Sequence, residues 1–201
     1  MKTALLPVVI AALAACSPPG AEPTGGGAQA GCMTRAYADI GGPISLVDQT
    51  GADVTEADFK GTPTLVFFGF TYCPDICPMT LYTMGQAMDL LPEGTTRPRT
   101  VLISVDPERD TPEALATYLS NAAFPAGSVG LTGTPEQIKA AADVFKAGYE
   151  RIETPDSLAG YTMDHTSLVY LMDEDWSLKT FFTHQTDANA MAQCLAAHLD
   201  G

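Results

Sequence analysis

Hydrophobic and polar positions along the chain predict strands and helices that follow one another in turn. A continuous apolar run at Thr64–Phe68 predicts a strand buried on both faces, and Thr100–Val105 predicts a second one. Between them, apolar residues recur three and four positions apart from Cys77 to Leu91, which predicts an amphipathic helix. Pro92 follows and ends that helix. This β-α-β order is typical of an α/β domain.

Further elements of the same kind flank this core. The pattern predicts an N-terminal hairpin around Ile44–Val47 and Val54, a helix after the N-cap Thr111, a short strand at Val129–Leu131, a helix from Thr134 to about Lys146, strands at Thr166–Met172 and Leu178–Phe182, and a last helix at Asp187–Leu199. Alternating β and α units predict a mostly parallel sheet covered by helices and closed by an antiparallel hairpin. We therefore predict an α/β fold, a thioredoxin-like sandwich with an N-terminal β-hairpin and a C-terminal helix.

The start of the chain follows a different pattern. Residues 4–13 are apolar but too few to span a bilayer as a helix, and Lys2 is the only charge before them. Leu13-Ala14-Ala15-Cys16 ends this stretch in the manner of a bacterial lipoprotein signal. We predict that residues 1–15 are a lipoprotein signal peptide and that Cys16 is lipidated. An ordinary signal peptide with an incidental cysteine is the alternative.

The residues after Cys16 predict a flexible tether, because Ser17–Gly31 is rich in Pro, Gly and Ala. We assign residues 16–36 to the lipidated N-terminus and tether, and residues 37–201 to one domain. The protein is then a membrane-anchored lipoprotein that faces the periplasm. Several acyl chains on one residue make such an anchor stable.

The charge balance excludes one class of partner. The chain has a formal net charge of −14, and residues 1–15 contain one Lys and no acid, so the remainder carries about −15. Nucleic-acid binding needs a basic surface, so we expect no nucleic-acid partner.

Two cysteines stand where the first predicted strand gives way to a helix. Cys73 and Cys77 have C-x3-C spacing, one residue longer than the redox motif C-x-x-C, which makes the pair a better metal chelate. Such a pair can close a disulfide, bind a soft metal, or alternate between the two. Cys32 and Cys194 would remain for each other in an oxidising compartment, with an unbridged pair as the alternative.

A histidine supplies a third candidate ligand. His165 precedes the strand predicted from Thr166, and in a thioredoxin-like sheet the loop before that strand faces the cysteines. A thioredoxin has a proline in this loop, whereas this chain has none after Pro155. Asp164 either orients the imidazole or is a solvated loop carboxylate.

These donors favour copper. Thiolates select Cu(I), and imidazole suits both copper states. Two thiolates and one imidazole therefore give a three-coordinate Cu(I) site. With water or another oxygen as a further ligand, the same site could accommodate Cu(II). The alternative is a structural disulfide beside a surface histidine. Other sulfur and imidazole groups are expected to stay outside the site: Met79, Met84 and Met88 as core residues, and His184 and His198 at the surface or a sheet edge.

Four segments of the chain resemble the Sco/SenC family of copper proteins. They are Gly42–Asp48 (GPISLVD), Phe68–Pro78 (FGFTYCPDICP), Ser104–Pro112 (SVDPERDTP) and Asp164–Thr166 (DHT). The resemblance implies that Cys73, Cys77 and His165 bind copper. It also implies a role in assembling the binuclear copper centre of cytochrome c oxidase. The implied partners are the copper-bearing oxidase subunit and other periplasmic copper chaperones. The family more often has an N-terminal transmembrane helix, and Cys32 and Cys194 lie outside its motif.

The same cysteines allow a different class of function. A periplasmic thiol-disulfide reductase would use Cys73 and Cys77 as a catalytic redox pair that reduces the target's cysteines before copper enters. A redox or copper sensor would signal through the same pair. The sequence therefore predicts a metallochaperone and leaves enzyme activity open.

Overall fold

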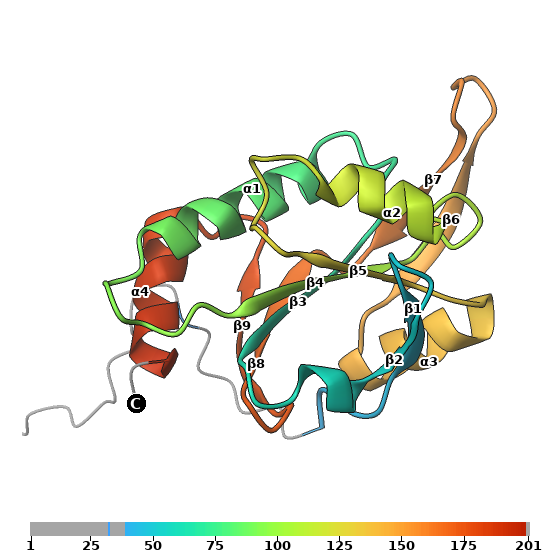
Figure 1. Cartoon of the computed structure of the whole chain (residues 1–201). Helices are drawn as coiled ribbons and strands as arrows, with labels where there is room; N and C mark the ends of the chain where they lie inside the picture. The colour runs from blue at the N-terminus through green and yellow to red at the C-terminus, as the bar shows by residue number, and fades with distance from the viewer. Residues whose placement is uncertain (1–31, 33–38, 200–201) are drawn as a thin grey trace, which may run out of the picture.

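The chain folds around one large sheet with a small hairpin beside it (Figure 1). The computed structural model describes residue 32 and residues 39–199. The large sheet has the order β2-β1-β5-β4-β3-β8-β9, and β6 and β7 form the second sheet. The strands are β1 (Ser45–Asp48), β2 (Asp53–Thr55), β3 (Thr64–Gly69), β4 (Arg99–Ser104), β5 (Val129–Thr132), β6 (Tyr149–Thr154), β7 (Gly160–His165), β8 (Leu168–Met172) and β9 (Leu178–Thr183).

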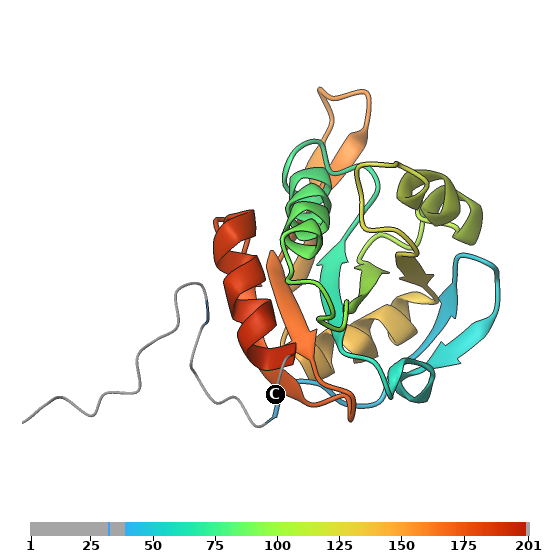
Figure 2. The ribbon, with the colours of Figure 1, turned by 60° about the vertical axis from the view of Figure 1, so that its left-hand side comes forward.

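Helices cover both faces of the large sheet. They are α1 (Ile76–Asp89), α2 (Pro112–Leu119), α3 (Pro135–Phe145) and α4 (Ala188–Leu199), with a short 3-10 helix at Glu56–Phe59. In Figure 1, α1 and α2 lie on one face and α3 lies on the other. Figure 2 shows α4 beside α1, next to the edge where β9 lies. None of the helices in the described part of the chain has the length and hydropathy that crossing a membrane requires.

The core centres on β3, whose six residues are all buried. Phe67 and Phe68 are completely inaccessible to solvent, and so are Leu102 and Ile103 on the neighbouring strand β4. Strands buried on both faces account for the unbroken apolar runs of the sequence. The thioredoxin-like α/β sandwich, with its N-terminal β1–β2 hairpin and C-terminal α4, is confirmed.

Helix starts follow the sequence signals closely. Thr111 caps α2 by accepting a hydrogen bond from the backbone N–H of Ala114, and Pro112 occupies the first turn. Thr134 and Gln137 form a reciprocal capping box at the start of α3. The helices predicted at these positions are confirmed.

The prediction of a mostly parallel sheet is wrong. Only β3–β4 and β4–β5 pair in parallel, whereas β1 pairs antiparallel with both β2 and β5, and β8 pairs antiparallel with both β3 and β9. Alternation of β and α units holds only for the central three strands. The segments at each end join the sheet as hairpins, and hairpins give antiparallel pairs.

A second difference concerns the residues between α3 and β8. We predicted no strands there, and the structure has the β6–β7 hairpin, paired from Tyr149–His165 to Thr154–Gly160. This hairpin projects from the body of the domain (Figure 1). None of its residues is buried and half are exposed, so the alternation of apolar and polar residues that predicts a half-buried strand is weak.

Candidate metal centre

The two free cysteines lie at the junction between β3 and α1. The chain leaves β3 at Gly69, and the backbone N–H of Cys73 donates to the carbonyl oxygen of Phe70. Helix α1 then starts so that Cys77 lies in its first turn. Cys77 is completely buried, whereas Cys73 is partly exposed. The pair therefore presents one thiol to solvent and keeps the other inside.

Gly69 makes room for the buried thiol. A Cβ at this position would lie 3.1 Å from the Cys77 sulfur, 2.9 Å from the Phe67 ring and 3.1 Å from a Leu102 methyl group. These contacts are closer than Cβ atoms normally make, so glycine lets the strand end pass beside Cys77 without displacing its neighbours. No sequence signal predicted this role of Gly69.

His165 reaches the cysteines from the other sheet. It is the last residue of β7, not a loop residue as predicted, and its Nε2 lies 3.6 Å from the Cys77 sulfur. Its Nδ1 lies 3.2 Å from the carbonyl oxygen of Thr166. A carbonyl oxygen can only accept, so Nδ1 donates to it, and Nε2 is the ring nitrogen that faces the cysteines.

Together, the donor atoms of Cys73, Cys77 and His165 all lie within 4.8 Å of one another. The rings of Phe67 and Phe70 stand edge-on to the imidazole, with centroids 6.1 and 5.8 Å away. Two soft thiolates and one imidazole in an apolar surround suit copper in its lower oxidation state. The arrangement can also close a local disulfide, since both cysteines are free.

The surroundings of the two thiols shift their pKa values in opposite directions. The hydrogen bond with Cys77 is the main cause that lowers the pKa of Cys73, to about 4, and His165 and the backbone N–H of Cys77 add to it. The same hydrogen bond and burial raise the pKa of Cys77 well above its ordinary range. Cys73 is therefore a thiolate at neutral pH, ready to bind a metal or to attack a disulfide.

A buried carboxylate supports the loop that carries Cys73. Asp110 accepts from the backbone N–H of Thr71 at 3.1 Å, from the Thr71 hydroxyl at 2.6 Å and from the Ser104 hydroxyl at 2.6 Å. Burial raises the pKa of this carboxyl group. Because Thr71 is two residues from Cys73, Asp110 fixes the backbone on the approach to the site.

An arginine links the Cys73 loop to the hairpin that carries His165. The Arg109 guanidinium lies 3.6 Å from the ring centroid of Tyr161 and 4.6 Å from that of Tyr72. It also forms an ion pair with Asp106 and donates to the carbonyl oxygen of Tyr161. The Tyr161 hydroxyl donates to Asp106 at 2.8 Å. Arg109 thus holds β7 against the loop before α1.

Sequence reasoning missed the roles of Arg109, Asp110 and Tyr161. Only the family resemblance pointed to the segment Ser104–Pro112. Its signal was a run of charged residues directly after a buried strand, at the same edge of the sheet as Cys73. Because parallel β3 and β4 end together, that position already placed these side chains near the cysteines.

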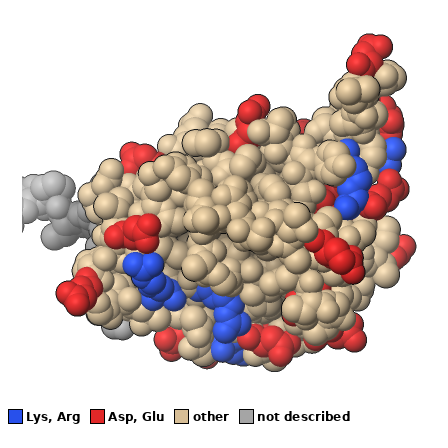
Figure 3. Space-filling view, turned by 45° about the horizontal axis from the view of Figure 1, so that its top comes forward, with Lys and Arg blue, Asp and Glu red and all other residues tan. Residues whose placement is uncertain are grey.

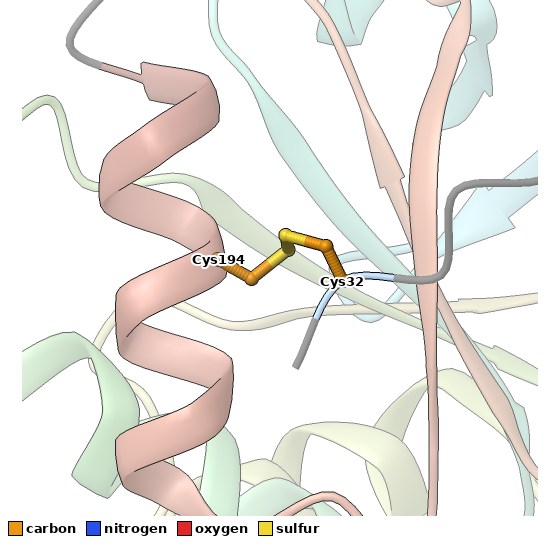
Figure 4. Close-up of a disulfide and its surroundings, with 2 residues drawn as sticks. All are labelled: Cys32 and Cys194. Atoms are coloured by element: carbon orange, nitrogen blue, oxygen red, sulfur yellow. A yellow bond between two sulfur atoms is a disulfide. The ribbon is translucent and has the colours of Figure 1, made fainter. Parts of the chain in front are cut away.

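The remaining cysteines lie elsewhere. Cys32 and Cys194 are joined by a disulfide across 162 residues, with a Cα–Cα distance of 5.3 Å, and the bridge ties the N-terminal segment to α4 (Figure 4). His198 lies one turn after Cys194 and completes a second group of two sulfurs and one imidazole within 4.8 Å. Cys16 falls outside the described residues.

The structure also tests the predictions for three methionines and for Asp164. Met84 and Met88 are buried as predicted, but Met79 has 58% of its surface exposed, so its core prediction is wrong. Helical spacing cannot separate the inner face from a solvent face that is also apolar. Asp164 is exposed, and the carbonyl group of Thr166 partners the imidazole in its place.

Comparison with known proteins gives a consistent result. A model of the SCO1/SenC family matches residues 33–200. Protein SenC of Rhodobacter capsulatus is 39% identical over 165 residues, which cover 82% of this chain and 73% of SenC. Arabidopsis thaliana ScoI, solved with copper bound, has a TM-score of 0.75 at 36% identity and covers 80% of this chain and 98% of its own. Copper-bound Bradyrhizobium japonicum ScoI has a TM-score of 0.69 at 39% identity, with 80% and 99% covered.

Proposed function

The chain belongs to the SCO1/SenC family, and we propose that it is a copper-binding metallochaperone which delivers copper to the binuclear centre of cytochrome c oxidase. One observation carries the proposal: two donors from the junction of β3 and α1 and one from the end of β7 converge within 4.8 Å. The solved structures with copper bound, which share this fold at 36–39% identity, support copper as the cargo. The family resemblance supports the oxidase subunit as the acceptor.

The different exposure of the two thiols suits a metal ion that must be passed on to another protein. Cys77 is buried and holds the metal from inside, while Cys73 lies on the open side of the site. An acceptor thiolate that approaches from solvent can bind the copper ion as Cys73 or His165 lets go. Each step replaces one ligand by another and needs no change of oxidation state. A three-coordinate site leaves room for the incoming ligand.

We also propose that the chain works as a lipoprotein in the periplasm. The support is the Leu13–Cys16 ending and the tether-like composition up to residue 36. Cys16→Ser, expressed behind a cleavable signal, is expected to move the protein from the membrane fraction to the soluble periplasm. Wild-type protein with an unmodified N-terminus in the soluble fraction would contradict lipidation.

A specific observation also supports the second candidate, a thiol-disulfide reductase. The partly exposed Cys73 has a pKa lowered to about 4, chiefly by its hydrogen bond with Cys77, and its partner is buried four residues away. An exposed thiolate with a resolving thiol behind it is the arrangement that disulfide exchange requires.

Two measurements on one sample separate these functions. Anaerobic titration with Cu(I) gives stoichiometry and affinity, and a mixed-disulfide reduction assay gives turnover. Tight binding of one copper ion with negligible turnover supports the chaperone. Weak copper binding with efficient turnover supports the reductase and overturns the proposal.

A further inference from the structure

Large apolar side chains form a line along the solvent side of α1. Tyr72, Ile76, Met79 and Tyr82 are 61%, 39%, 58% and 40% exposed, and we call these four residues the apolar stripe. They are spaced by four, three and three positions, which places those on α1 along one face of the helix. The stripe begins one residue before Cys73, so it is continuous with the metal centre.

The solvent face of α1 differs from that of another helix in the same domain. Helix α3 exposes Glu136, Lys139 and Asp143. Helix α1 contains no charged residue before its last position, Asp89. Figure 3 turns the α1 side forward and shows a broad uncharged area, with acidic and basic side chains toward its edges. A monomer gains nothing from an apolar solvent face, so such a face indicates an interaction site.

We propose that the apolar stripe is the docking surface for the copper acceptor, and that the acceptor presents an apolar, uncharged face around its own copper ligands. The inference rests on the proposed function. Ligand exchange requires the acceptor's ligand atom to reach the copper ion at Cys73, and a protein that reaches Cys73 also covers the start of α1. Aromatic and methionine side chains are the types that contribute most to protein interfaces.

Charge argues against two other occupants. A second copy would bring two chains of net charge −14 together, and their repulsion opposes self-association through this face. A membrane-surface helix usually carries Lys or Arg on its polar side, and α1 has neither. The stripe therefore fits a folded partner better than a lipid surface or another copy of this chain.

Copper transfer kinetics test the proposal. Chains loaded with one Cu(I) are mixed with the soluble copper-bearing domain of the oxidase subunit, or with a small Cu(I) chelator that needs no docking. The Met79→Gln, Tyr82→Gln double variant is expected to raise the acceptor concentration for half-maximal transfer at least tenfold, while transfer to the chelator is unchanged. Leu90→Gln is the matched control, because Leu90 is 51% exposed at the C-cap of the same helix and about 12 Å along its axis from Tyr82.

Two further experiments make the result specific. Met79→Leu keeps the apolar surface and removes the thioether, so this variant should transfer copper at the wild-type rate. Slow copper transfer by Met79→Leu would make Met79 a copper ligand and overturn its docking role. Transfer should change little between 50 and 500 mM salt, because the stripe is uncharged. A steep fall with salt would replace apolar docking by charge steering.

The outcomes keep the two proposals apart. If wild type delivers copper and the double variant delivers it equally well, docking on the stripe is wrong and the chaperone function stands. If wild type binds copper but gives none to the oxidase domain, the proposed function fails and the inference fails with it. Dimers that form in wild type and vanish in the double variant on sedimentation would assign the stripe to self-association.

Discussion

Among the residues that the structure describes, two groups each combine two cysteine sulfurs with one histidine, and the two groups are in different states. Cys73, Cys77 and His165 bring their donor atoms within 4.8 Å, and both thiols are free. Cys32, Cys194 and His198 meet the same distance limit, yet their sulfurs are bonded to each other. We call them the open cluster and the bridged cluster. The types of donor residue alone therefore do not distinguish a metal site from a disulfide.

The two clusters differ in how far apart their cysteines lie in the sequence and in how accessible the sulfur atoms are to solvent. The open cluster takes its cysteines from four positions apart at a helix start, where the Cys77 backbone N–H stabilises the Cys73 thiolate at 3.3 Å. The bridged cluster joins residues 162 positions apart, and its Cys194 is completely buried. A local pair can open and close without loss of the fold, whereas a long-range bridge restricts the unfolded chain.

The largest expected effect is on stability. A Cys32→Ala, Cys194→Ala double variant should lose about 4–5 kcal/mol in free energy of unfolding, because the bridge closes a loop of about 160 residues. Cys73→Ser is the control and should cost less than about 1 kcal/mol, because its side chain is partly exposed. Urea unfolding at constant pH measures both. Equal losses in the two variants would remove the distinction between the clusters.

The next effect is on Cu(II) affinity and uses the two histidines as a matched pair. His165→Ala should weaken Cu(II) binding at least about 100-fold, or roughly 2.7 kcal/mol, because imidazole is the ligand that suits the oxidised metal. His198→Ala should leave the affinity unchanged, since the sulfurs beside it are bonded to each other. Competition with a chelator of known affinity measures the change. A loss in His198→Ala would show copper at the bridged cluster.

A smaller effect concerns the support beneath the open cluster. Asp110→Ala leaves the Thr71 N–H and the Ser104 hydroxyl without their acceptor and should cost about 2 kcal/mol of stability. Copper affinity should fall with it, because Thr71 leads into Cys73. The bridged cluster should stay oxidised, which thiol counting checks. An Asp110→Ala chain with wild-type copper affinity would make Asp110 purely structural.

The same carboxyl group gives a pH dependence with a definite sign. Burial raises the pKa of Asp110 in the folded chain, so the folded state favours its protonated form. Its contribution to stability is present below the unfolded pKa and is lost as pH rises through the folded pKa. Asp110→Asn cannot titrate and should flatten this part of the stability profile, which begins above the unfolded pKa of about 3.9. An unchanged slope would assign it to other groups.

The smallest effect is on thiol reactivity. With a pKa lowered to about 4 by the hydrogen bond with Cys77, Cys73 should react with iodoacetamide at a nearly constant rate from pH 5.5 to 8 in the metal-free, reduced chain. An ordinary thiol reacts about tenfold faster per pH unit over this range. Mass spectrometry of the alkylated Cys73 peptide gives the rate. A tenfold rise per unit would show that the open cluster has no special acidity.

How far the sequence predicts this molecule differs between its parts. Buried β3 and the caps at Thr111 and Thr134 are predictable because apolar runs and local hydrogen bonds act over a few residues. The β6–β7 hairpin was missed because neither of its strands has a buried face. Because this hairpin was not predicted, His165 was assigned to a loop. Its place beside the two cysteines was nevertheless predicted.

Side-chain partners over long distances were the least predictable. Asp110 meets Thr71 across 39 residues, and Arg109 meets Tyr161 across 52. Composition and periodicity carry no information on such pairs, since they depend on how the strand ends align. Met79 shows a different source of error. Its helical spacing from Met84 and Met88 predicted a buried residue, but the same spacing also occurs on a solvent face that carries apolar side chains.

Copper stoichiometry in two double variants tests the central claim most directly. Each is titrated anaerobically with Cu(I) after mild reduction that leaves any Cys32–Cys194 bridge intact. We predict no tightly bound copper in Cys73→Ser, Cys77→Ser and one copper ion in Cys32→Ser, Cys194→Ser, provided the latter is folded by circular dichroism. One copper ion retained in the first variant would contradict the assignment of the metal centre to Cys73, Cys77 and His165.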